Sequence, residues 1–211
     1  MTITAIKKKG SRLIQIEVDS QQVITLDRRT FDESPYRPGS EISEEELEEL
    51  IGLSEQRRSR EKAYYLLSLR DHSRKELEKK LQRTTDSATA AATVDRMEEL
   101  GLVNDENFAR NRANYLMLRK FYPAKRAVME LCALGIDRDT AQDAVDSLGC
   151  DDANQALALL NKKYYNSKVS KDKDGCRKMA AYLARYGFGG DAIRRALKEF
   201  IPIGQDFELD D

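Results

Sequence analysis

The chain has 211 residues, of which 40% are hydrophobic and 35% are charged, and its formal net charge is −1. This length suits one sizeable domain or two small ones, and the absence of an apolar run of about 18 residues argues against a transmembrane helix. The N-terminal segment lacks the apolar stretch of a secretion signal, and the three cysteines are too scattered for a disulfide framework, so we expect a cytoplasmic protein.

The N-terminal segment alternates apolar and polar residues in three stretches, at 3–8, 12–18 and 22–26, with turn-like residues between them. Alternation with a period of two is typical of half-buried β-strands, so these stretches predict a small three-stranded meander. Prolines and a glycine then indicate an irregular segment over 27–42. We expect residues 1–42 to form an N-terminal β-strand extension.

An acidic segment follows the predicted strands. From Asp32 to Glu55 the sequence holds nine acidic residues and one basic residue. Ser43 and Glu46 form the pattern of a capping box, and carboxylates suit the first turn of a helix. We therefore predict an acidic linker helix over 43–56, whose charges form a solvated face. The alternative is a regulatory acidic arm that competes with nucleic acid for basic sites.

The rest of the chain repeats itself. Segment 63–82 recurs without a gap 50 residues later, from Ala113, and segment 130–145 recurs 52 residues later, at 182–197. A period near 50 built from helical patterns indicates tandem copies of one unit, which share a core because short helices cannot bury their apolar faces alone. The predicted segments are three-helix repeats at 57–103, 104–150 and 151–201, followed by an acidic tail at 202–211.

Local signals define the helices of the first repeat. An apolar stripe that includes Leu69 predicts a helix over 57–69, and Ser73, with a glutamate three residues later, predicts the start of a second. The third is expected over 90–100, with Leu100 facing inward. We therefore expect a mainly α protein whose three copies of a three-helix repeat form a curved, right-handed-type solenoid, with a small N-terminal β meander.

Basic residues gather at related positions of the repeats. Lys and Arg outnumber Asp and Glu in 57–83, 110–129 and 162–178, each near the junction of the first and second helices. One such cluster is usually solvated surface, but aligned clusters form a stripe, which is the electrostatic footprint of a surface that binds a polyanion. We predict contact with nucleic acid or nucleoprotein. The candidate contact residues are Arg70, Arg74, Lys75, Arg119, Lys120, Tyr122, Lys125, Arg126, Arg177 and Lys178.

Tyrosines are interspersed among these basic residues and could stack on exposed bases. Tyr65 and Tyr115 occupy equivalent positions of two repeats, which favours a role in the core for both. Tyr122 lies at a helix junction and is the better candidate for surface contact.

Several kinds of catalytic and metal site are missing from the sequence. His72 is the only histidine, so neither a His-based triad nor a His-rich metal site can form. The sequence contains no CxxC pair, glycine-rich phosphate loop or HExxH motif. The cysteines are expected to be packing residues. We therefore expect a protein that is not an enzyme and that has no cofactor and no metal.

The repeat region resembles the RecX family, regulators of the RecA recombinase. The resemblance rests on AYYLLSLRDHSRKELEKKL at 63–81, on MEELGLVNDENFAR at 97–110 and on ELCALGI at 130–136 with its echo in the third repeat. It covers roughly residues 57–200, and the N-terminal strands and acidic helix are similar to an extension that some bacterial members carry.

The resemblance implies a modulator that lies in the groove of the RecA–single-stranded DNA filament. It implies inhibition of filament extension or strand exchange, and so regulation of recombination, DNA repair and the SOS response. We expect a monomer without membrane contact that binds single-stranded DNA weakly or only with the filament. The alternatives are a stand-alone nucleic-acid-binding repeat protein, a peptide-binding scaffold and an enzyme.

Overall fold

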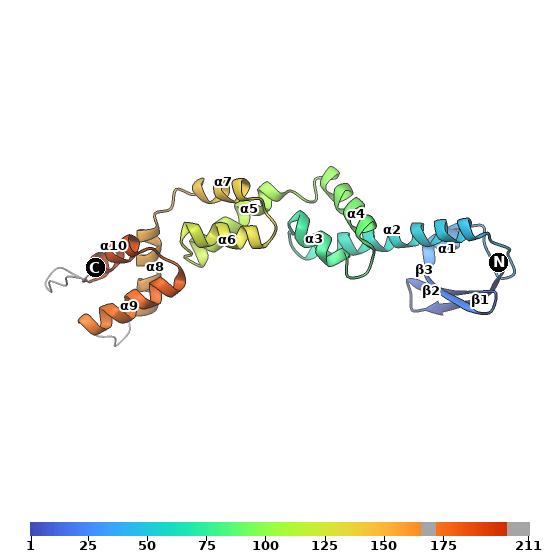
Figure 1. The fold of residues 1–211 in the computed structure, drawn as a ribbon, viewed down its shortest axis with the longest axis horizontal. Coiled ribbons are helices and arrows are strands. Elements are labelled where there is room, and N and C mark those ends of the chain that lie inside the picture. The colour runs from blue at the N-terminus through green and yellow to red at the C-terminus, as the bar shows by residue number, and fades with distance from the viewer. Residues whose placement is uncertain (166–171, 202–211) are drawn as a thin grey trace. The chain divides into compact units, whose positions relative to one another are not determined.

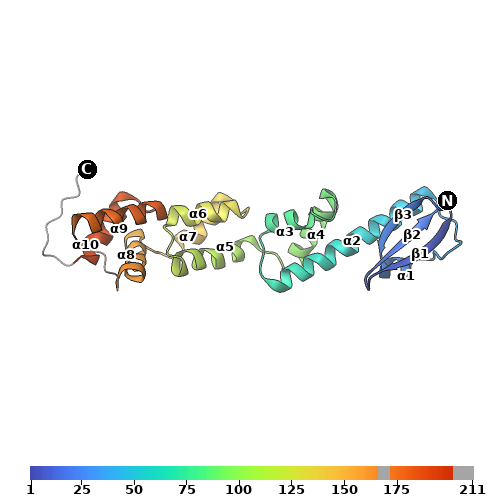
Figure 2. The same ribbon diagram turned by 90° about the horizontal axis from the view of Figure 1, so that it is seen from below.

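The computed structural model describes residues 1–165 and 172–201, so the predicted acidic tail at 202–211 lies outside the described residues. The chain forms two compact units, Met1–Val103 and Asn104–Asp211. Both are built mainly from helices, and the N-terminal unit adds a small sheet (Figures 1 and 2). The predicted fold class, helical repeats with an N-terminal β meander, is confirmed.

The described elements follow one another along the two units. The N-terminal unit contains β1 (Ile3–Lys9), β2 (Leu13–Val18), β3 (Gln22–Asp27), α1 (Arg28–Glu33), α2 (Glu44–Leu69), α3 (Arg74–Leu81) and α4 (Ser87–Glu99). The C-terminal unit contains α5 (Asp105–Asn114), the π-helical turn η1 (Tyr115–Arg119), α6 (Ala124–Ala133), α7 (Arg138–Asp146), α8 (Asp152–Tyr164), α9 (Lys173–Tyr186) and α10 (Gly190–Phe200).

The three strands form an antiparallel sheet in the order β1-β2-β3. In β2 the buried residues Ile14, Ile16 and Val18 alternate with less buried ones, because successive side chains of a strand point to opposite faces. The buried face packs on Leu47 and Leu50 of α2. The predicted meander is confirmed, and α2 supplies the support that so small a sheet needs.

Helix α1 occupies part of the segment that the sequence predicted to be irregular. Asp27 caps it, since its carboxylate accepts a hydrogen bond of 2.9 Å from the Thr30 backbone N–H. Phe31 on the same short helix is buried against the sheet and α2. The prolines further along indicated an irregular segment, but the cap at Asp27 starts a short helix before them.

Helix α2 runs without a break from Glu44 to Leu69, whereas the sequence predicted a separate acidic helix ending near residue 56. The expected capping box of Ser43 and Glu46 starts it. Two small buried residues fit it to its neighbours. The Ser54 hydroxyl accepts a 2.7 Å hydrogen bond from the Asp27 N–H, and Ser59 lies 2.8 Å from the Thr93 hydroxyl on α4. One helix therefore serves both the sheet and the first repeat.

The first repeat buries a core between α2, α3 and α4. Ala63, Leu77 and Met97 are fully buried there. The predicted inward positions of Leu69 and Leu100 are wrong, because these side chains are 63% and 44% exposed. Both lie at helix ends: Leu69 is the last residue of α2, and Leu100 is the C-cap of α4, after which the chain turns away from the helix axis.

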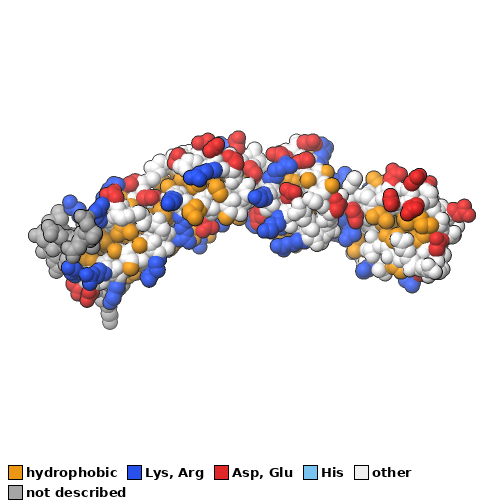
Figure 3. All heavy atoms as spheres, in the orientation of Figure 1, with side chains coloured by type: hydrophobic (Ala, Val, Ile, Leu, Met, Phe, Trp, Pro, Cys, Tyr) orange, Lys and Arg blue, Asp and Glu red, His pale blue; other side chains and the backbone are white. Residues whose placement is uncertain are grey.

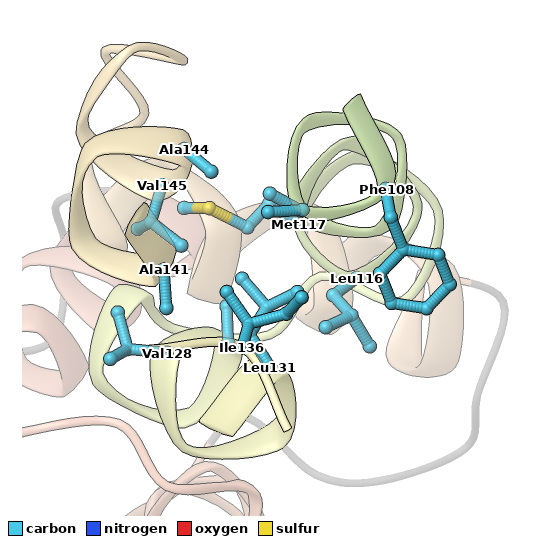
Figure 4. Packing of buried hydrophobic residues seen from close by; sticks show 12 residues of the cluster. Phe108, Leu116, Met117, Val128, Leu131, Ile136, Ala141, Ala144 and Val145 are labelled. Carbon is cyan, nitrogen blue, oxygen red and sulfur yellow. The ribbon is translucent and has the colours of Figure 1, made fainter. Parts of the chain in front are cut away.

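The sequence predicted a core shared between repeats, but the second repeat has its own core between α5, η1, α6 and α7, shown in Figure 4. Met117 and Leu131 are almost completely buried at its centre, and Ala141 and Ala144 allow α7 to approach closely. The third repeat packs α8, α9 and α10 around a further cluster that includes Leu183. Phe121, from the connection between α5 and α6, also packs against that third cluster.

Removing a buried side chain of the second repeat should destabilise it. Leu131 is fully buried, so we expect Leu131→Ala to lower the free energy of unfolding by about 2–5 kcal/mol through lost apolar burial and a residual cavity. Urea unfolding followed by circular dichroism is the measurement, because the chain has no tryptophan. Met129 on the same helix is 64% exposed, and Met129→Ala should change the value by less than about 0.5 kcal/mol. If the two substitutions lowered the free energy of unfolding equally, the buried position of Leu131 in this core would be contradicted.

Candidate nucleic-acid interface

The basic residues of the first repeat have carboxylate partners. Ser73 caps α3 through a 3.1 Å hydrogen bond from the Glu76 N–H, as predicted, and the Glu76 carboxylate binds Arg70 at 2.9 and 2.5 Å. These hydrogen bonds raise the pKa of Arg70 and lower the pKa of Glu76. Arg74 binds two carboxylates of α4, Asp95 and Glu98. A phosphate would have to compete with these carboxylates for either arginine.

The second repeat differs at the equivalent junction, because its backbone is irregular there. The chain leaves α5 through the π-helical turn η1, in which the Lys120 N–H donates to the Tyr115 carbonyl at 3.1 Å. Phe121 then has a left-handed backbone with φ of 56°, which is uncommon for a bulky residue. Arg119 and Lys120 are exposed, and among the residues that the structure describes neither has an ion-pair partner.

Arg126 joins the second repeat to the third. Its guanidinium carbon lies 3.9 Å from the ring centroid of Tyr122 and 5.1 Å from that of Tyr186. The same group donates a 2.8 Å hydrogen bond to the Tyr186 carbonyl, and the two rings meet edge to face at 5.3 Å. The Tyr186 hydroxyl donates to the Lys120 carbonyl at 2.8 Å, and burial raises the pKa of this tyrosine.

The predicted roles of the tyrosines are therefore reversed. Tyr122, predicted for the surface, is half-buried in the contact with Arg126. Tyr65 and Tyr115, predicted for the core, are 62% and 42% exposed. Each lies two positions after a fully buried alanine, Ala63 or Ala113. Two residues turn an α-helix by about 200°, so the tyrosines fall on the opposite face.

A shallow groove of about 610 Å³ lies between α6 and α9. Gly187 ends α9 with φ of 107°, and a Cβ there would lie 3.5 Å from Pro123, so the two helices approach closely at this point. The groove combines an exposed apolar side chain, Met129, with positive charges. Its lining residues are Lys125, Arg126, Met129, Glu130, Ala133, Arg185, Tyr186 and Gly187.

The structure divides the predicted contact residues into two groups. Four have partners within the fold: Arg70, Arg74, Tyr122 and Arg126. The others are exposed and have no ion-pair partner among the described residues: Lys75, Arg119, Lys120, Lys125, Arg177 and Lys178. Most of this second group lies on the C-terminal unit. Their role in binding stays a prediction.

Sequence reasoning missed three further residues of this surface: Tyr115, Met129 and Arg185. The position of Tyr115 relative to Ala113 could have revealed its exposure. Met129 and Arg185 gave no such signal, because they meet only where α6 lies beside α9. On the face of the C-terminal unit that Figure 3 shows, blue Lys and Arg side chains lie beside orange hydrophobic ones.

The described residues show neither a metal site nor a membrane-spanning helix. Within 1–165 and 172–201, no group of three or more His, Cys, Asp or Glu side chains could hold a metal ion. In the same part of the chain no helix is both long enough and apolar enough to cross a membrane.

Comparisons with known proteins decide the family. Models of the first and third three-helix domains of RecX match residues 60–97 and 151–197. The regulatory protein RecX of Stenotrophomonas maltophilia is 35% identical over 139 residues, which cover 65% of this chain and 84% of that protein. The chain belongs to the RecX family. The RecX of Clostridioides difficile is 28% identical over 196 residues and 92% of each chain.

Two RecX crystal structures share the fold. The RecX of Lactobacillus salivarius superposes with a TM-score of 0.58 at 23% identity, covering 70% of this chain and 97% of that one. A second regulatory protein RecX gives a TM-score of 0.60 at 16% identity, covering 94% and 98%. RecX proteins are named as regulatory proteins, so the chain is a member of a family of regulators.

Arg126 and Lys125 are neighbours that should behave differently on substitution. Arg126→Met removes the guanidinium stacked on two tyrosines and its hydrogen bond, so we expect the free energy of unfolding to fall by about 1–3 kcal/mol. Lys125→Met alters an exposed side chain and should change it by less than about 0.5 kcal/mol. Urea unfolding of both variants is the measurement. A neutral Arg126→Met would show that Arg126 does not hold the two repeats together.

His72 is buried at the junction of α2 and α3, with 3% of its surface exposed. Its Nδ1 lies 2.9 Å from the Arg70 carbonyl, while Nε2 has no hydrogen-bond partner in the part of the chain that the structure describes. Burial, more than any other effect, lowers the pKa of His72; the hydrogen bond to the Arg70 carbonyl and the charge of Glu76 oppose it, and the charges of Arg70 and Lys80 act in the same direction as burial. The neutral ring is therefore the form that the fold favours.

This burial predicts a loss of stability in acid. The unfolded chain takes up the His72 proton near pH 6.5 and the folded chain at a lower pH. Between those values the unfolded state binds more protons, so stability is complete above pH 6.5 and falls as the pH falls toward the folded-state pKa. The slope is at most about 1.4 kcal/mol per pH unit. Urea unfolding of wild type and His72→Asn from pH 8 to 5 should show a difference that changes with pH; a constant difference would contradict the prediction.

Proposed function

We propose that this protein regulates a RecA recombinase by binding the RecA–single-stranded DNA filament, and that it inhibits the filament. Membership of a family of regulatory proteins supports a regulatory role. The observation that carries the proposal is a groove of the C-terminal unit in which the exposed Met129 lies with Lys125 and Arg185, two exposed cations that have no ion-pair partner among the described residues.

The cations suit a phosphate backbone. Arg119, Lys120 and Lys125 belong to the second repeat, and Arg177 and Lys178 to the third, with Arg177 lying 52 residues after Lys125 in the repeat register. A cation that already has a carboxylate partner gains less from a phosphate than a free one, so this unit is better suited to the contact than Arg70 and Arg74 are. Each phosphate neutralised on a single strand contributes about 0.7 to the salt dependence of binding.

The groove beside these cations favours a nucleoprotein over bare nucleic acid. Met129 is 64% exposed in a groove whose rim carries Lys125 and Arg185. An exposed apolar side chain adds little to phosphate binding, but it is suited to burial against a protein. A filament offers protein surface and phosphate together, and contacts from two repeats strengthen each other.

A stand-alone nucleic-acid-binding protein is the second candidate, supported by the same cations. It requires no protein partner, and its binding would depend on charge alone. Binding to free single-stranded DNA that is as tight as binding to the filament would favour it.

RecA's hydrolysis of ATP on single-stranded DNA tests the proposal. We expect the wild-type protein to inhibit hydrolysis at less than one chain per RecA. The triple variant Arg119→Glu, Lys120→Glu, Lys125→Glu should be at least about 10-fold less potent, because three phosphate contacts become repulsive. Arg126 is left unchanged because it packs between tyrosines.

The matched control reverses three exposed cations elsewhere on the same unit. Arg138→Glu, Arg194→Glu, Lys198→Glu changes the net charge equally on α7 and α10 and should inhibit like the wild type. If this control is as weak as the first triple variant, net charge alone governs the effect. If the wild type has no effect at several-fold excess over RecA, the recombinase is not its partner and the second candidate stands.

A further inference from the structure

An exposed aromatic side chain lies beside the free cations of the second repeat. Tyr115 begins the π-helical turn η1 and is 42% exposed, and Leu118 in the same turn is 49% exposed. Neither belongs to the core cluster of the second repeat, in which Leu116 and Met117 are buried. Packing in the core therefore does not account for a large ring at this position.

Positive charge flanks this ring. The Arg112 guanidinium carbon lies 5.2 Å and the Lys120 Nζ 5.7 Å from the Tyr115 ring centroid. Arg119 is exposed on the same turn. Both distances are within the roughly 6 Å of a cation–π contact, so a base that stacks on the ring would lie beside these cations or displace one of them. No carboxylate pairs with these three cations among the described residues.

The backbone holds this arrangement in place. The left-handed Phe121 turns the chain so that Phe121 packs against the third repeat and Tyr122 against Arg126. The Lys120 carbonyl is held by the Tyr186 hydroxyl at 2.8 Å. Backbone strain and π-helical turns are frequent at functional sites, and here both adjoin the exposed ring. A ring on a fixed backbone loses little entropy when a ligand stacks on it.

We propose that Tyr115 is a base-stacking position for single-stranded nucleic acid, with Arg119 and Lys120 contacting the phosphates on either side of the stacked base. An unpaired base offers a flat π-face to the ring, whereas the bases of a duplex are covered by their neighbours. This site belongs to the surface of the proposed function and rests on it for the identity of the polyanion.

The repeat-equivalent tyrosine provides a contrast. Tyr65 is 62% exposed beside Arg12 and Arg28 in a groove of about 580 Å³. Those arginines lie 3.8 Å from Glu61 and 3.3 Å from Asp32, so their charges are balanced. Arg29 also lines this groove and has no ion-pair partner among the described residues, but two of the three arginines beside Tyr65 are paired, so Tyr65 is the comparison with fewer unpaired cations.

Direct binding to labelled oligo-dT at low salt, measured by fluorescence anisotropy without RecA, tests the site. We expect Tyr115→Ala to weaken binding about 5- to 150-fold, the range for loss of one stacked base. Tyr115→Phe and Tyr65→Ala should bind like the wild type. Lys120→Gln should lower the salt slope by about 0.7, whereas Tyr115→Ala should leave the slope unchanged.

An abasic oligonucleotide of the same length separates stacking from other effects. The wild type should bind the abasic strand about as weakly as Tyr115→Ala binds oligo-dT. On the abasic strand, Tyr115→Ala should bind no more weakly than the wild type. Tyr115→Leu, which keeps apolar bulk on an exposed position, should fold normally and bind like Tyr115→Ala. The proposal would be overturned if Tyr115→Ala bound dT as tightly as the wild type. It would also be overturned if the substitution weakened binding to the abasic and dT strands equally.

These outcomes are distinct from failure of the proposed function. If the wild type binds dT through Tyr115 but does not affect RecA, the stacking site stands and only the recombinase is ruled out as a partner. If Tyr115→Ala weakens inhibition of RecA yet binds dT normally, Tyr115 contacts protein and the stacking proposal is wrong. If the wild type does not bind dT at low salt, the stacking proposal also fails.

Discussion

The contact of Arg126 with Tyr122 and Tyr186 is the interaction on which the C-terminal surface depends. Through it the first turn of α6 is joined to the end of α9, by stacking and by a hydrogen bond to the Tyr186 carbonyl. The second and third repeats each bury their own apolar cluster, so a contact such as this one is needed to hold them in register. Because α6 and α9 are fixed here, Lys125 and Arg185 can line one groove.

The two units use the arginines of the predicted contact set differently, although Arg110, Arg194 and Arg195 of the C-terminal unit also pair with carboxylates. In the N-terminal unit, Arg70 and Arg74 each bind a carboxylate of the same unit. In the C-terminal unit, Arg126 is stacked on aromatic rings, and the cations around it remain exposed. The formal net charge of −1 conceals this difference. Composition reports how many charges a chain has, whereas function depends on which of them have partners.

The sequence was sufficient for features that depend on local chemistry. The strands followed from alternation, and the cap of α3 followed from Ser73, because period and capping involve residues close in the chain. Features that depend on long-range contact were not predictable in this way. The partners of Arg74 lie more than 20 residues away on α4, and the tyrosine partner of Arg126 is 60 residues away. The exposure of Tyr115 could have been predicted from its position two residues after Ala113. Its equivalence to Tyr65 in the repeat was instead taken to indicate burial.

The unbroken helix α2 has a consequence for how the protein is assembled from parts. Its 26 residues span about 39 Å, with Leu47 and Leu50 in the core of the sheet and Ala63 in the core of the first repeat. A flexible linker would let the sheet move independently, but a shared helix fixes its distance and direction from that repeat. A displacement of the sheet, whether by a force or by a bound ligand, is therefore passed on to the first repeat through the rigid helix. The extension is mechanically part of the first repeat, and an insertion in α2 would rotate the sheet about the helix axis by about 100° per residue.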